Sequence, residues 1–240
     1  GIIDGTPPHS ADPRYPGARE EIIDFGAFWD TRLLEAQSET IKSLSDRKSG
    51  LFATAYKYLS VCRSIRNERE ALLSAGSKNE KAAAAVHRLF RHTGQGRGFR
   101  LIPRQISAVG MNGITDFGTY AANAGEIWLV NDRRGLSSAI FGMMISEAEK
   151  LGLETQISRN YLLEPDALYF PETGVAVLSD CDAGKASKII NTDRFIDPEK
   201  LAEKRASLRF LINLENELFR RALGIFGEIR ECHFAVEDIY

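Results

Sequence analysis

The first group of residues that could do chemistry is a turn after a short apolar run. In "EIWLVNDRRGLSSAIFGMMISEAEKLG", residues 126 to 152, an expected strand leads into a turn with Gly135 and then a helix starting with hydroxyls. A phosphate-binding loop has this layout: glycines let backbone N–H groups wrap the phosphates, a lysine reaches the terminal phosphates and a hydroxyl binds Mg²⁺. The candidate cofactor-binding residues are Arg133, Arg134, Gly135, Ser137 and Ser138.

The strict phosphate-loop pattern fails at two of its positions. Val130 stands where the first glycine belongs, and Leu136 stands where the lysine belongs. Asp132 would repel a phosphate, whereas the two arginines of the turn would attract one. A helix N-terminus still favours an anion. We therefore expect weak binding at most, without efficient hydrolysis, and an ordinary strand-to-helix turn is the favoured alternative.

Two aspartates follow apolar runs and are candidate metal ligands. Asp4 ends "GIID" and Asp180 ends "GVAVLSD". A carboxylate at a strand end can hold Mg²⁺ through water in phosphoryl-transfer enzymes. His9 could position a phosphate or a water, so Asp4 and His9 are the candidate catalytic residues. The alternatives are a turn-capping aspartate, because Asp-Gly favours turns, and a structural histidine.

A basic segment offers a function of another class. Residues 87 to 104, "HRLFRHTGQGRGFRLIPR", carry five arginines and no acidic residue, so they could contact phosphates of nucleic acid or nucleotide. A non-catalytic binding module would use Arg91, Arg97, Arg100 and Arg133. We favour a solvated linker here, which makes nucleic acid a less favoured partner, and an interaction scaffold without a small ligand is the third alternative.

The periodicity of apolar residues predicts an α/β fold. Spacings of three and four predict helices over 18–48, 51–73, 79–92, 135–152 and 198–229. Short apolar runs predict strands over 104–109, 126–130, 153–158, 167–170 and 174–180. Strands that alternate with helices favour a parallel sheet flanked by helices.

An internal repeat organises the chain. Shifting residues 22 to 70 by 167 positions without gaps gives eleven identities, including Asp30 with Asp197 and Ala55 with Ala222. About three would arise by chance in chains of average composition. The repeat predicts the end of a first unit over 1–78, a helix and Gly/Arg-rich linker over 79–100, and a complete second unit over 101–240. We therefore expect the chain to be a fragment of a longer protein.

The composition excludes several classes of protein. The chain has 43% hydrophobic residues, a net charge of −2 and apolar runs too short to span a membrane. Its three cysteines lie far apart without a CxxC motif, which predicts reduced thiols and a cytoplasmic location.

The motifs together resemble an uncharacterised family of bacterial tandem P-loop ATPase-like proteins. The resemblance rests on "DGTPPHSADPRYPG" at residues 4–17, on "EAEKLGLE" and on "EPDALYFPETGVAVLSD". It implies two P-loop units, ATP and Mg²⁺ as cofactors, and Asp4 in the magnesium shell of the first unit. With Leu136 in place of lysine, the second unit would be degenerate and structural or regulatory. The chain alone is then expected to be inactive, with the nucleotide and the missing part of the first unit as its partners.

Overall fold

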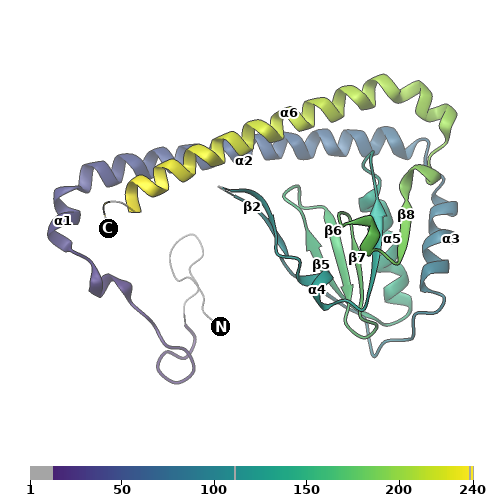
Figure 1. The fold of residues 1–240 in the computed structure, drawn as a ribbon, viewed down its shortest axis with the longest axis horizontal. Coiled ribbons are helices and arrows are strands. Elements are labelled where there is room, and N and C mark those ends of the chain that lie inside the picture. The colour runs from purple at the N-terminus through teal and green to yellow at the C-terminus, as the bar shows by residue number, and fades with distance from the viewer. Residues whose placement is uncertain (1–12, 111, 238, 240) are drawn as a thin grey trace.

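The computed structural model describes residues 13–240, apart from 111, 238 and 240. An α/β unit lies at one end of a pair of long helices that run side by side (Figure 1). The helices are α1 (Thr31–Ala36), α2 (Ser38–Ser74), α3 (Asn79–Phe90), α4 (Thr119–Asn123), α5 (Ser137–Lys150) and α6 (Pro198–Glu237). Three short 3-10 turns are η1 (Phe25–Phe28), η2 (Ala183–Lys185) and η3 (Thr192–Phe195).

The described strands form a six-stranded sheet and a separate two-stranded ribbon. They are β1 (Arg100–Pro103), β2 (Ser107–Gly110), β3 (Gly113–Asp116), β4 (Glu126–Asn131), β5 (Glu154–Arg159), β6 (Pro165–Phe170), β7 (Val175–Leu178) and β8 (Lys188–Asn191). The sheet order is β1-β5-β6-β7-β4-β8, and β2 pairs with β3 in the ribbon. Only β6 runs antiparallel to its neighbours in the sheet. The predicted α/β class is therefore confirmed, with a sheet that is mostly rather than wholly parallel.

Apolar clusters cover both faces of the sheet. On one face α3 and α5 bury Phe90 and Phe141 against Trp128 and Phe170 of the strands. The other face carries a smaller cluster around Tyr120 of α4. Alternate residues of each strand point to opposite faces, which explains why the central strand β7 is buried throughout.

The two long helices bury positions that the sequence repeat equates. Apolar residues at spacings of three and four give α2 and α6 one apolar stripe each, and the stripes face each other. The equivalent buried pairs are Ala55 and Ala222, Leu59 and Phe226, Cys62 and Ile229, and Ile65 and Cys232. The helices run antiparallel, since Arg47 reaches Glu228 while Cys62 reaches Glu215.

The segments before the two helices also begin and end at equivalent positions. η1 and η3 are separated by the repeat length, and so are the first residues of α1 and α6. The side chains of Asp24 and Asn191 each accept a hydrogen bond from the backbone N–H group two residues later in the chain. The side chains of the helix-capping Asp30 and Asp197 do the same. The same short-range hydrogen bonds therefore recur in both copies.

The surroundings of these segments differ. Phe28 is 83% exposed whereas its equivalent Phe195 is 3% exposed, and Ile23 is 62% exposed against 6% for Ile190. In the second copy Ile190 pairs with Val130 of β4, and Phe195 joins the main core. Among the described residues, the first copy has no corresponding sheet.

Three expectations from the sequence need correction. The helix expected over 18–48, with a possible interruption at Gly26, is wrong for 18–30, where η1 is the only helical element. Asp24 and Asp30 have extended backbones there, and each caps the helical turn that follows it. The helix expected from 51 is part of α2, which starts at Ser38. The strand expected over 104–109 is replaced by β1 and β2, with a break between them.

None of the described helices has an apolar stretch that could cross a bilayer. The three cysteines are unpaired, and burial is the largest cause of the raised pKa of Cys62.

Candidate functional site

The turn between β4 and α5 is shaped by its glycine. Gly135 has φ of +105°, a left-handed conformation that L side chains rarely adopt. A Cβ added there would lie 3.3 Å from Nη2 of Arg69. Glycine at position 135 therefore suits both the backbone conformation of this turn and its close approach to the Arg69 side chain of α2.

The carboxylate of Asp132 occupies the centre of the turn. It accepts hydrogen bonds from the backbone N–H groups of Arg134 at 3.1 Å, Gly135 at 3.1 Å and Ser137 at 2.6 Å. The Thr192 hydroxyl donates a fourth at 2.8 Å. Burial alone would raise the pKa of Asp132, but these hydrogen bonds outweigh it and hold the pKa below its ordinary value. The N–H groups of the turn that could bind an external anion are therefore already bound to the Asp132 carboxylate.

The remaining residues of the turn have separate partners. Arg134 Nε donates to Asp193 Oδ1 at 2.8 Å, so its charge is balanced within the protein. Arg133 is exposed, and the Ser138 hydroxyl is buried without a hydrogen-bond partner among the described residues. Leu136 is buried against Leu73. Of the five predicted cofactor-binding residues, Arg134, Gly135 and Ser137 thus meet around Asp132.

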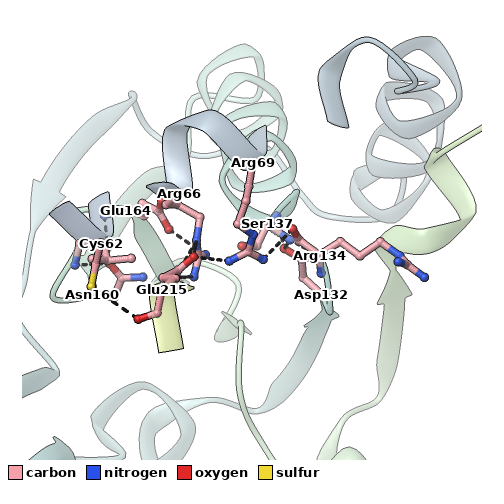
Figure 2. Close-up of polar contacts among 11 residues, drawn as sticks. Cys62, Arg66, Arg69, Asp132, Arg134, Ser137, Asn160, Glu164 and Glu215 are labelled. Atoms are coloured by element: carbon pink, nitrogen blue, oxygen red, sulfur yellow. Dashed lines mark hydrogen bonds and ion pairs between the residues drawn. The ribbon is translucent and has the colours of Figure 1, made fainter. Parts of the chain in front are cut away.

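A buried ionic cluster joins this turn to the two long helices (Figure 2). Arg69 of α2 donates from Nη2 to the Arg134 carbonyl at 2.8 Å and pairs through Nη1 with Glu215 of α6. Arg66, one turn earlier, binds the same Glu215 and also Glu164 at 3.2 Å. Arg69 and Glu215 are 5% and 3% exposed, so their charges depend on each other.

The sequence contains a signal for this cluster. Cys62, Ile65, Arg69 and Leu73 share the buried face of one helix. An arginine inside an apolar stripe predicts a buried partner, because a charge is seldom buried unless it is paired. The identity of that partner, Glu215, could not be predicted, since it lies 146 residues away.

The predicted metal and catalytic residues are not brought together within the described structure. Asp4 and His9 lie outside the described residues. Asp180 is exposed, two residues beyond β7, at the same sheet edge as Asp132 because β7 and β4 are parallel neighbours. Across the described part of the chain, no three His, Cys, Asp or Glu side chains are grouped as metal ligands.

The arginines of the alternative binding module are spread over the unit. Arg100 starts β1 and pairs with Glu154, whereas Arg133 follows β4, four strand spacings or about 19 Å across the sheet. The glycine-rich linker between α3 and β1 packs on the end of α5, where a Cβ at Gly96 would lie 2.2 Å from the Gly152 carbonyl oxygen. Gly96 therefore has a structural use.

Comparison of the chain with protein-family models, curated proteins and solved structures found no match.

Proposed function

We propose that the α/β unit is the degenerate, non-catalytic second unit of a duplicated P-loop-like ATP-binding protein, with a structural or regulatory role. The carboxylate of Asp132, bound to the N–H groups of the β4–α5 turn, carries this proposal. In a working phosphate loop the equivalent N–H groups bind phosphate. An incoming phosphate would have to displace the Asp132 carboxylate, which is hydrogen-bonded and also negatively charged.

The position of Leu136 supports the same conclusion. Its side chain is 7% exposed and packs with Leu73, Ile196 and Leu208 between the long helices and the α/β unit. A lysine here would place a charge in an apolar cluster, which is costly without a partner. The residue therefore stabilises the junction of helix and sheet.

The repeat supports a duplicated architecture. The capping residues, 3-10 turns and buried helix positions of the two copies coincide. Of the equivalent segments 21–24 and 188–191, however, only 188–191 forms a strand of the sheet in the described structure. We propose that residues 21–24 pair in the same way with an α/β unit equivalent to 100–191. ATP and Mg²⁺, with Asp4 and His9 beside them, would belong to that other unit.

Titration calorimetry with Mg²⁺-ATP and a phosphate-release assay test the assignment of the turn. We expect neither binding at the β4–α5 turn nor turnover, because Asp132 fills the site and a lysine is missing. The matched variants are Ser137→Ala within the turn and Ser146→Ala on the exposed face of α5. ATP binding that Ser137→Ala abolishes and Ser146→Ala preserves would refute the proposal.

A further inference from the structure

A second site lies away from the β4–α5 turn, in a groove between helix α2 and the sheet. Its volume is about 810 Å³. One wall is α2, from Tyr56 to Arg63, and the other comprises the ends of β1 and β5, the start of β2 and the loop after β5. In Figure 1 the β2 ribbon reaches from the α/β unit toward α2. The carboxyl ends of parallel strands, as at β1 and β5, are a common location for ligand sites.

All the charged side chains that line the groove are positive. Its lining includes Arg63 from α2, Arg104 just after β1 and Arg159 at the end of β5, and it includes no acidic residue. None of these three arginines takes part in an ion pair among the described residues; Arg159 donates to the Leu163 carbonyl at 3.0 Å. The groove therefore presents guanidinium groups that form no close ion pair within the described protein, although Arg104 lies near enough to Glu154 to interact with it electrostatically.

The next arginines along α2 show the contrast. Arg66 and Arg69 follow Arg63 at spacings of three, and both are neutralised by Glu215, with Glu164 as a further partner of Arg66. The buried arginines thus have structural partners, whereas the exposed Arg63 has none in the described structure. The Arg63 guanidinium is therefore available to an anionic ligand, and its planar shape suits phosphate.

Aromatic side chains lie next to these charges. Tyr56 lines the groove and is 59% exposed, while its ring also packs against Phe52 and Phe226. Tyr161 is fixed by a stacked contact with Phe219, with ring centroids 4.2 Å apart. Burial raises the pKa of Tyr161 to about 12, so its hydroxyl keeps its proton and can donate.

We propose that this groove binds the phosphodiester backbone of single-stranded nucleic acid, with Arg63, Arg104 and Arg159 on the phosphates and Tyr56 as a platform for a base. A cationic groove with an exposed aromatic ring is the arrangement that holds single strands without sequence readout. Arginine suits phosphate because its planar fork donates two hydrogen bonds to one phosphate group. The proposal does not depend on the fate of the β4–α5 turn.

Fluorescence anisotropy with a labelled oligothymidylate tests the groove. The groove variant is Arg63→Gln/Arg104→Gln, since neither side chain forms an ion pair in the described chain. The matched control is Arg91→Gln/Arg97→Gln, two exposed arginines of the linker. We expect the groove variant to weaken binding at least about tenfold at low salt and to reduce the slope of log K against log salt by about 1.4, or 0.7 for each lost phosphate contact. Circular dichroism confirms that both variants are folded.

Each outcome decides the proposal. Loss of affinity in the groove variant alone supports it, whereas equal affinity in the groove variant and wild type overturns it. Absence of oligonucleotide binding by the wild type also overturns it. Full competition by free ATP at equal phosphate concentration would make the ligand a small nucleotide and would overturn the single-strand assignment. If the wild type binds ATP and the groove variant does not, the ATP site is the groove, and the proposal for the β4–α5 turn still stands. The two proposals can therefore fail independently.

Discussion

At the scale of single residues, Asp132 determines what the β4–α5 turn can bind. One carboxylate satisfies three backbone N–H groups and a hydroxyl, and these groups in turn keep it ionised despite its burial. The turn retains the backbone shape of an anion site while supplying the anion from its own chain.

Removal of this carboxylate should reopen the site. Asp132→Ala leaves the N–H groups of Arg134, Gly135 and Ser137 unpaired, and we expect a loss of about 1–3 kcal/mol in the free energy of unfolding. Inorganic phosphate should then stabilise the variant but leave wild type unchanged, which urea denaturation with and without phosphate will measure. Equal stabilisation of both proteins would mean that phosphate binds elsewhere.

The same carboxylate should contribute to the acid sensitivity of the protein. Its folded pKa lies below the ordinary value of about 3.9. Its stabilisation is therefore complete above that value and is lost as the pH falls through the lower folded pKa. Asp132→Asn should reduce the dependence of unfolding free energy on pH below about pH 4, and an unchanged dependence in that range would contradict this assignment.

At the scale of elements, the connection between helices and sheet depends on charges that the sequence alone could not pair. Periodicity predicted α3, α5, β4 and the start of α6 well, because each has a continuous apolar pattern and clear end signals. It missed β8, whose "KIIN" is only four residues long and becomes a strand through pairing with β4. It also missed the closure of the turn by Asp132, since which N–H groups meet a side chain depends on tertiary geometry.

Glu215 is the element-level position to test. Glu215→Gln leaves Arg66 and Arg69 without their shared counter-charge, so we expect a loss of about 3–5 kcal/mol in the free energy of unfolding. Glu217→Gln is the matched control, because Glu217 lies on the same helix and forms exposed pairs with Arg220 and Arg221. Such surface pairs contribute little, about 0–1 kcal/mol. A similar effect of both substitutions in urea denaturation would remove the structural role assigned to the cluster.

At the scale of the whole molecule, the two long helices form a pair with nearly symmetric halves. Ala55 and Ala222, equivalent in the repeat, lie in one buried cluster between antiparallel helices. The two halves are therefore related by an approximate two-fold axis. This axis places the start of α1 in one half at the position that the start of α6 has in the other half. The α/β unit fills one end of the pair, and apolar residues around η1 are exposed at the other (Figure 1).

This asymmetry predicts that equivalent substitutions have unequal effects. Phe195→Ala should cost about 3–5 kcal/mol because it opens a cavity in the main core. Phe28→Ala, at the equivalent position of the first copy, should change the unfolding free energy by less than about 0.5 kcal/mol, since its ring is exposed in this chain. Urea denaturation of the two variants makes the comparison, and Ile190→Ala in β8 with Ile23→Ala at the equivalent position repeats it five residues earlier. A large loss for Phe28→Ala would show that the first copy packs within the chain, and would refute the proposal that its apolar residues pair with another α/β unit.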